Sequence, residues 1–354
     1  MSTGVVVTHA HRTAVGKSGR GTLRETRPDE LLGRLIESFM ERVPDLDPAD
    51  VDDVIVGCAF PEAEQGMNVA RIAALRAGLP VSVPGMTLNR FCSSGLQSLA
   101  TGSAQIAAGW SKIVITGGVE SMSLVPMGGQ KPAPNPALVE SFPASYDSMG
   151  ITSETVAERY DVSREDQDAF AVESNRRALE AISEGRFKDE IIPIEVTLGG
   201  KQVVFDTDEG PRESTLEGLS KLRPVFKVDG RSTAGNSSQT SDGAAIEVLM
   251  TREAASAYGL SPLAELVTYQ VAGVHPDEMG IGPTVAIPKA LDAAGLSLDD
   301  IGLVELNEAF ASQALYSIRK LGLDPSIVNV NGGAIALGHP LGCTGAKLTA
   351  TLLH

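Results

Sequence analysis

Apolar and polar positions follow two spacings along this chain, one typical of strands and one typical of helices. Short β-branched runs such as Val5-Val6-Val7 predict buried strands, and apolar residues that recur every three or four positions predict helices between them. Strands are expected at 5–7, 51–56, 86–88, 113–115, 244–249 and 303–306, and helices near 31–39, 69–75, 92–108, 152–160 and 164–184. Strands that alternate with helices in this way predict a layered α/β fold.

A segment of different composition interrupts the alternation. Residues 121–145 are rich in Met, Pro and Gly, and after two helical patterns the chain stays polar to about residue 240. We therefore expect a first α/β unit of residues 1–120 and 241–255, an inserted domain of residues 121–240, and a second α/β unit of residues 256–354. Insertions on a rigid scaffold are common places for substrate recognition.

The two α/β units repeat at a constant offset of 250 residues. Asp50-Val51 aligns with Asp300-Ile301, and Gly95 aligns with Gly345. Several matches at one offset indicate a duplicated unit, with coincidence between two generic α/β stretches as the alternative. A duplication brings the helix starts at the two glycines together across a pseudo-twofold axis. It also places the last two strands of the second unit beyond residue 354, so we expect that unit to be incomplete.

Composition and charge restrict the function. The chain has 354 residues, of which 42% are hydrophobic, and no uninterrupted apolar run is long enough to span a membrane. Its 45 acidic and 29 basic residues give a net charge of −16, which argues against nucleic-acid binding and requires local cations for any anionic ligand. Three cysteines, none in a CxxC pair, indicate a reducing compartment, which we expect to be the cytoplasm, and no structural zinc site.

Two motif-like segments do not meet the requirements of the motifs they suggest. Gly16-Lys17-Ser18 matches the end of a phosphate-binding loop, but that loop needs a glycine five positions earlier, where His11 stands. His9 and His11 share one face of a predicted strand, and two surface polar residues explain this spacing better than a metal pair does. We therefore predict no metal site.

Cys92 is the first candidate for catalysis. It stands where a predicted strand ends and an apolar helix begins. Unpaired N–H groups and the helix dipole at such a start stabilise a thiolate, so the pKa of Cys92 is expected to be lowered. The alternative is a buried structural cysteine.

Two further junctions carry polar groups of matching chemistry. His339 lies in a glycine-rich loop before Pro340, at the next helix start, where a neutral imidazole can take a proton from a thiol. Asn307-Glu308 follows the predicted strand at 303–306, and an amide there suits an oxyanion hole, although ordinary turn polarity is the alternative. Cys343 aligns with Ser93 and is interpreted as a packed small residue.

These segments resemble the thiolase family. Asn89-Arg90-Phe91-Cys92-Ser93-Ser94-Gly95 is similar to its nucleophile block, Asn307-Glu308-Ala309-Phe310 to its Asn-Glu-Ala-Phe block, and Gly338-His339-Pro340 to its Gly-His-Pro block. The resemblance extends over nearly the whole chain. It implies a duplicated α/β/α/β/α layered core with an inserted loop domain, and a homodimer or homotetramer.

The resemblance also implies a reaction and its residues. Cys92 is expected to be acylated by 3-ketoacyl-CoA, releasing acetyl-CoA, and then to pass the acyl group to free CoA, which is a substrate rather than a separate cofactor. His339 would activate Cys92 and bind the thioester oxygen. Asn307 would hold a water in that oxyanion hole, and the Cys92 N–H would serve the second hole.

Six further residues match binding positions of the family. Ser238 and Ala234 match pantetheine contacts, and Met149, Met279 and Phe310 match the lining of the acyl pocket. Arg212 is the best match for a contact with the CoA nucleotide, across a one-residue gap.

Two departures from the family pattern bear on the activity. Ser148 replaces the histidine of acetoacetyl-specific biosynthetic members, which makes the chain more similar to the degradative 3-ketoacyl-CoA thiolases of fatty-acid β-oxidation. The family's second cysteine, which protonates the leaving enolate, is expected in a Cys-x-Gly segment beyond residue 354, so this chain would acylate but cleave C–C bonds poorly. The alternatives are a biosynthetic acetoacetyl-CoA thiolase and a non-catalytic CoA-binding subunit.

Overall fold

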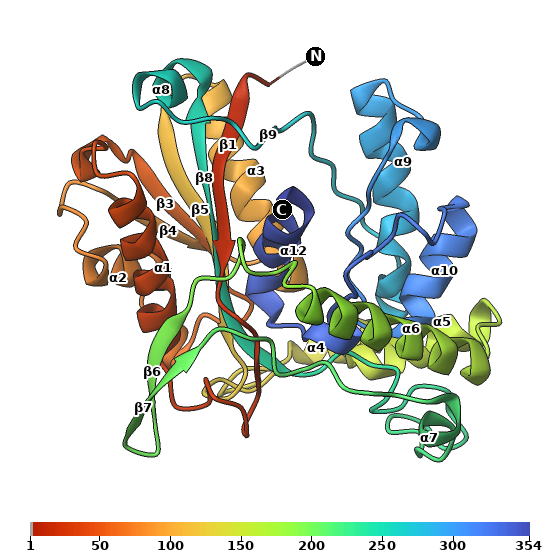
Figure 1. The fold of residues 1–354 in the computed structure, drawn as a ribbon. Helices are drawn as coiled ribbons and strands as arrows, with labels where there is room; N and C mark the ends of the chain where they lie inside the picture. Colours follow the sequence, from red (N-terminus) through yellow and green to blue (C-terminus); the bar gives the residue numbers. More distant parts are fainter. Residues whose placement is uncertain (1–2) are drawn as a thin grey trace.

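The computed structural model describes residues 3–354, and a mixed seven-stranded sheet forms its centre (Figure 1). The strand order is β4-β3-β5-β8-β1-β9, with β2 paired to β8 off this path. The strands are β1 (Val5–Arg12), β2 (Gly16–Lys17), β3 (Asp53–Gly57), β4 (Gly85–Leu88), β5 (Ile113–Ser121), β8 (Ser241–Thr251) and β9 (Ala264–Glu265). β3 is parallel to β4 and β5, whereas β8 is antiparallel to both of its neighbours, β1 and β5.

Alternating side chains along the strands hold two helical layers on the sheet. In β3, Val54 and Val56 face the helices α1 (Pro28–Arg42) and α2 (Val69–Arg76). Ile55, between them, faces α3 (Ser94–Ala107) and α12 (Thr344–Leu353). Because successive strand residues point to opposite faces, an all-apolar run is required where both faces are covered. The helix α12 of the second unit therefore completes the layer over the first unit's sheet.

The predicted repeat and its pseudo-twofold arrangement are confirmed. The 3₁₀ turns η3 (Phe91–Ser93) and η7 (Leu341–Cys343) lead into α3 and α12, so both pairs of starts differ by 250 residues. A Cβ on Gly95 would lie 2.5 Å from the backbone N of Ala346, and one on Gly345 would lie closer still to the backbone N of Leu96. These contacts are reciprocal, and only glycine permits them.

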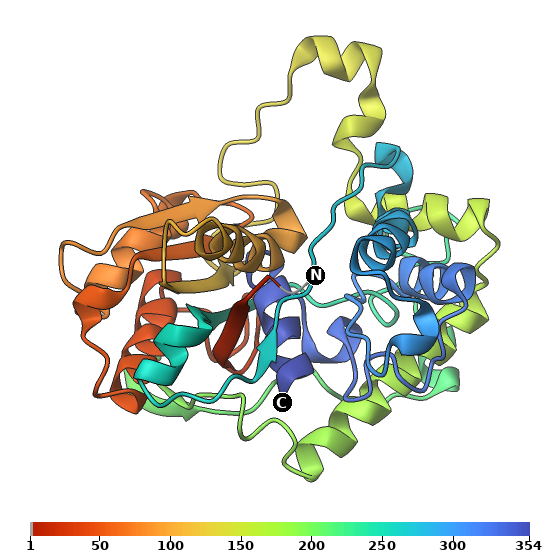
Figure 2. The same ribbon diagram turned by 90° about the horizontal axis from the view of Figure 1, so that it is seen from above.

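The inserted residues form helices, a hairpin and a projecting arm. The elements of the insertion are α4 (Pro136–Ser141), η4 (Pro143–Tyr146), α5 (Met149–Arg159), α6 (Arg164–Ser183), β6 (Ile194–Leu198), β7 (Lys201–Phe205) and α7 (Leu216–Ser220). The two predicted helices are confirmed as α5 and α6, and the arm that carries α4 stands away from the rest of the chain (Figure 2). The hairpin β6-β7 was not predicted, although Gly199-Gly200 between two alternating runs is a hairpin signal.

The second unit contributes mostly helices, and its predicted strand at 303–306 is wrong. Its remaining elements are α8 (Arg252–Ala257), η5 (Pro276–Ile281), α9 (Gly282–Ala294), η6 (Leu298–Asp300), α10 (Ala311–Leu321) and α11 (Ala334–Leu337). In place of a strand, Val304 makes one parallel bridge to Val328. Asn329 Oδ1 accepts from the Leu306 N–H at 2.7 Å, and Asn329 Nδ2 donates to the Leu306 carbonyl at 2.8 Å. A side chain therefore makes the hydrogen bonds that a neighbouring strand would make.

A buried ion-pair network joins the sheet to the insertion. The Arg12 guanidinium on β1 is 1% exposed and contacts Asp208 at 2.8 Å and Glu190 at 2.6 Å. Removing one member of such a network leaves an unpaired buried charge, so the three residues fix the insertion against β1. In the part of the chain that the structure describes, no helix is long and apolar enough to cross a membrane.

Candidate active site

A tight turn after β4 places Cys92 at the start of α3. Phe91 has φ +44°, a left-handed conformation that costs a non-glycine residue about 1–3 kcal/mol. Two side chains stabilise the turn, because Asn89 Oδ1 accepts from the Phe91 N–H at 2.7 Å and Ser94 Oγ accepts from the Arg90 N–H at 2.8 Å. Cys92 is partly buried and packs against Met122 and Leu341, so the nucleophile candidate contacts the turn that follows His339.

The hydrogen bonds of His339 define its tautomer. Thr344 Oγ1 lies 2.6 Å from His339 Nδ1 and donates its own proton to the carbonyl of Pro340. With its proton on that carbonyl, the hydroxyl accepts from the ring at Nδ1. Asn307 Nδ2, which can only donate, lies 3.3 Å from Nε2, so the assigned tautomer has the proton on Nδ1 and a lone pair on Nε2. Burial, with a smaller contribution from the Lys347 ammonium, lowers the pKa of His339 to about 3. The imidazole is neutral and its Nε2 can receive a proton.

Asn307 lies beside this lone pair. Its Nδ2 is 3.3 Å from His339 Nε2. Its Oδ1 is buried and has no hydrogen-bond partner among the residues that the structure describes. Since buried polar atoms are nearly always paired, this oxygen is a candidate contact for a water or a ligand.

A buried carboxylate joins the turn after His339 to the loop after β3. Glu120, at the end of β5, accepts from the N–H groups of Ala59 and Gly342, both at 2.8 Å, and from Gln65 Nε2 at 2.7 Å. One oxygen of Glu120 thus joins the loop after β3 to the turn after His339. Burial raises the pKa of Glu120 despite these donors.

A second buried carboxylate, Glu308, fixes the other side of the His339 loop. It accepts from Ser174 Oγ at 2.7 Å, from Asn329 Nδ2 at 2.9 Å and from the Ile335 N–H at 3.2 Å. A Cβ on Gly333 would collide with this carboxylate, so glycine is required there. Glu308 thereby connects α6 to the segment before His339.

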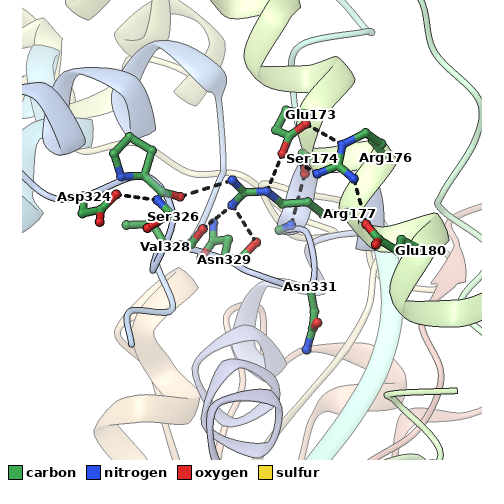
Figure 3. Close-up of polar contacts among 12 residues, drawn as sticks. Glu173, Ser174, Arg176, Arg177, Glu180, Asp324, Ser326, Val328, Asn329 and Asn331 are labelled. Carbon is green, nitrogen blue, oxygen red and sulfur yellow. Dashed lines mark hydrogen bonds and ion pairs between the residues drawn. The ribbon is translucent and has the colours of Figure 1, made fainter. Parts of the chain in front are cut away.

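Arg177 on α6 supports this connection. Figure 3 shows its guanidinium reaching from α6 to the chain at Val328 and Asn329. It donates to the carbonyls of Val328 at 2.7 Å and Pro325 at 3.2 Å, while Glu173 accepts from its Nε at 2.7 Å. The insertion therefore holds the polypeptide on which Asn307 and His339 depend.

The expected lowering of the Cys92 pKa is wrong. Burial, followed by the negative charge of Glu120, raises the pKa of Cys92 to about 12, although the thiol's own backbone N–H acts in the opposite direction. Cys92 lies in the turn η3, before the first residue of α3, and the adjacent carboxylate opposes a second negative charge. The resting residue is therefore a neutral thiol that needs a base.

A cavity of about 740 Å³ opens beside this centre. Ser238, Ala234 and Arg212 line it, as does Phe226. Thr240 also lines the cavity, and its backbone makes a parallel β-bridge to His339. The cavity thus leads to the catalytic loop and has a size typical of small-molecule sites.

The three predicted acyl-pocket residues lie outside the described lining of this cavity. Phe310 meets Phe226 edge-to-face, with ring centroids 5.7 Å apart. Met149 begins α5 next to Gly150, whose α-carbon lies against Phe226. Met279 lies in η5 and is 40% exposed. Phe310 and Met149 therefore flank the cavity beside the Phe226 ring.

The interpretation of Cys343 as a packed residue is confirmed, because it is 1% exposed and clusters with Ala245 and Ala346. Sequence reasoning missed the supporting roles of Glu120, Thr344 and Arg177. A signal existed for Glu120, since a charged residue that ends a continuous buried strand needs several partners.

The raised pKa gives a testable pH dependence. Alkylation of Cys92 by iodoacetamide requires the thiolate, whose fraction rises about tenfold per pH unit below a pKa of about 12. We expect the rate at Cys92, followed by peptide mass spectrometry, to rise continuously from pH 6 to pH 10. The urea-unfolded chain, with an ordinary cysteine pKa of about 8.5, should level off within this range. A plateau near pH 7 in the folded protein would contradict the assignment.

Comparisons with known proteins agree with this geometry. Residues 5–253 match the thiolase N-terminal domain, and residues 260–354 match the thiolase C-terminal domain. A 3-ketoacyl-CoA thiolase of Bacillus subtilis (strain 168) is 56% identical over 364 residues, covering 100% of this chain and 93% of that protein. The peroxisomal 3-ketoacyl-CoA thiolase A of Rattus norvegicus is 48% identical, covering 99% of this chain and 82% of that protein.

A solved structure shares the fold as well. The dimeric peroxisomal thiolase of Saccharomyces cerevisiae superposes with a TM-score of 0.93 at 42% identity, covering 99% of this chain and 90% of that one. Both domain models match, and together they account for nearly all of the described chain. The chain belongs to the thiolase family.

Proposed function

We propose that this chain acts as a 3-ketoacyl-CoA thiolase, an acetyl-CoA C-acyltransferase of fatty-acid β-oxidation. One observation carries the proposal: the helix starts behind Cys92 and His339 cross at two glycines, next to a cavity of about 740 Å³. A thiol, a neutral base and a substrate-sized cavity are the parts that acyl transfer through a covalent thioester requires.

The first half-reaction is acylation of Cys92. The thiol proton moves to His339 Nε2, and the sulfur attacks the 3-keto carbon of 3-ketoacyl-CoA. The C2–C3 bond then breaks, the acyl group stays on Cys92, and the electron pair leaves on the α-carbon of acetyl-CoA. An acid must protonate that carbon, and buried Cys343, packed against Ala245 and Ala346, is not that acid.

The second half-reaction regenerates the thiol. The thiol of a second CoA gives its proton to the group that protonated the α-carbon, and its sulfur attacks the acyl-Cys92 carbonyl. The bond between the acyl carbon and the Cys92 sulfur breaks, the shortened acyl-CoA leaves, and His339 Nε2–H returns its proton to the Cys92 sulfur. His339 Nε2–H, once formed, and a water held by the free Asn307 Oδ1 would stabilise one oxyanion. The Cys92 N–H would contribute to the other.

Binding assignments follow the cavity. Ser238 and Ala234 would contact the pantetheine arm, Arg212 the nucleotide, and Met149, Met279 and Phe310 the acyl chain. Ser148 caps α5 by accepting from the Ile151 N–H at 3.4 Å. It stands where acetoacetyl-specific members have a histidine, and this replacement favours the degradative branch. CoA serves as substrate, and we propose no other cofactor and no metal.

We further propose a homodimer, with residues 121–240 acting as the substrate domain. The strand β4 ends the sheet without a further neighbour among the described residues, and Met86 on it is 36% exposed. Such an edge is suited to pairing with a second copy. Sedimentation of the native protein distinguishes a dimer from a tetramer.

The three free cysteines are in keeping with a reducing compartment, which we propose to be the cytoplasm.

Thiolysis of 3-ketoacyl-CoA by CoA tests the proposal. The native protein should release acetyl-CoA and a shortened acyl-CoA at a low rate, because no acid for the leaving carbon is assigned among the described residues. It should turn over longer 3-ketoacyl-CoAs better than acetoacetyl-CoA. Cys92→Ser should abolish product formation, because a serine hydroxyl has no base strong enough to ionise it here. Equal turnover by Cys92→Ser and the native protein would disprove the assignment.

Thr344 tests the tautomer of His339. Thr344→Val removes the acceptor of the Nδ1 proton, so the ring can present Nε2–H, which cannot accept a proton. We expect about a tenfold to hundredfold loss in kcat with little change in KM. Thr344→Ser keeps the hydroxyl and should restore most of the activity. Loss in both variants would indicate a packing role instead.

A further inference from the structure

A second group of residues lines the cavity, from a loop that the proposed mechanism does not use. Lys17 ends β2, Ser18 and Arg20 follow it, and all three line the same cavity as Arg212. This is the segment whose spacing does not fit a phosphate-binding loop, and its backbone forms no such loop here. Its side chains nevertheless bring two cations to the cavity.

The loop is held firmly in place. Glu209 accepts from the backbone N–H groups of Lys17 and Thr22, both at 3.0 Å. The Ser18 N–H donates to the carbonyl of Thr240 at 3.0 Å, and the Gly19 N–H donates to Ser123 Oγ at 2.8 Å. Four backbone contacts thus fix the loop against the cavity, so the two cations start from a defined backbone.

These cations are also free to meet a ligand. Among residues 3–354, no carboxylate oxygen lies within 4 Å of a side-chain nitrogen of Lys17, Arg20 or Arg212, whereas many other arginines of the chain are paired. Glu213 is the one acidic residue in the described lining. Glu209 lines an adjoining hollow with Lys17 and Arg20, and Arg212 donates to the carbonyl of Ala234 at 3.4 Å. In a chain of net charge −16, three cations without an ion-pair partner among the described residues still form a local site for an anion.

We propose that Lys17 and Arg20, together with Arg212, bind a phosphate group of CoA. The inference depends on the proposed function, because CoA is the phosphate-bearing ligand that function supplies. An ammonium and a guanidinium bind phosphate through charge-assisted hydrogen bonds without the backbone cradle of a phosphate-binding loop. The phosphate is either in the diphosphate or at the 3′ position of the ribose, and both present the same chemistry.

Calorimetric binding of free CoA to the full chain tests this site without requiring turnover. Lys17→Ala/Arg20→Ala should raise the Kd for CoA about tenfold, because each exposed charge contact accounts for a few-fold in affinity. The Kd for pantetheine, which has no phosphate, should stay unchanged. Added salt should weaken CoA binding to the native protein more than to the variant. An unchanged thermal midpoint shows that the variant is folded.

A matched control separates a local site from overall charge. Lys112→Ala/Lys320→Ala removes two exposed cations that lie outside the cavity lining, and it should leave the Kd for CoA unchanged. An equal rise in Kd for this control would overturn the proposal, as would an unchanged Kd in Lys17→Ala/Arg20→Ala or an equal loss for pantetheine. With dephospho-CoA, a loss that persists assigns the site to the diphosphate, and a loss that disappears assigns it to the 3′-phosphate.

Failure of the phosphate site and failure of the proposed function give different results. If the native chain binds CoA through Lys17 and Arg20 but never performs thiolysis, the phosphate site stands and the enzymatic function does not. If the native chain performs thiolysis while the variant binds CoA normally, the enzymatic function stands and the phosphate site is disproved.

Discussion

The close crossing of two helix starts is the constraint on which the site depends. Gly95 lies against the backbone of Ala346, and Gly345 lies against the backbone of Leu96, so any side chain at either glycine would force α3 and α12 apart. Cys92 lies in the turn η3, which leads into α3, and His339 lies just before the turn η7, which leads into α12. A site drawn from two units 250 residues apart thus exists because two backbones approach within van der Waals contact.

Buried carboxylates convert this proximity into fixed geometry and also determine the charge state. Glu120 holds the turn at Gly342 against the loop at Ala59, and Glu308 holds the chain before His339 against α6. The charge of Glu120 also opposes ionisation of Cys92, while burial keeps His339 neutral. Cys92 and His339 are therefore both uncharged at rest. The proton moves from the Cys92 thiol to His339 only during the reaction, and the resting enzyme holds no thiolate–imidazolium pair.

Much of the fold was predictable because its signals are local. Periodicity located the sheet and helices of the first unit, and the offset of 250 residues predicted the meeting of the two helix starts. The strand at 303–306 was mispredicted, because apolar pattern does not reveal that the Asn329 side chain replaces a partner strand. The pKa of Cys92 was predicted in the wrong direction, since burial and, after it, the charge of a carboxylate 28 positions later in the sequence both raise this pKa. Lys17 and Arg20 were passed over because their spacing, rather than their location, was considered.

The dependence of Cys92 acylation on His339 tests the central claim most directly. Rapid mixing with acetyl-CoA followed by intact-mass measurement gives the rate at which one acetyl group appears on Cys92. With His339→Gln, we predict a rate about 10²–10⁴-fold below that of the native chain, which is the range for loss of a general base. His275→Gln, which changes an exposed histidine elsewhere, should react at the native rate. Acylation of His339→Gln at the native rate would contradict the account.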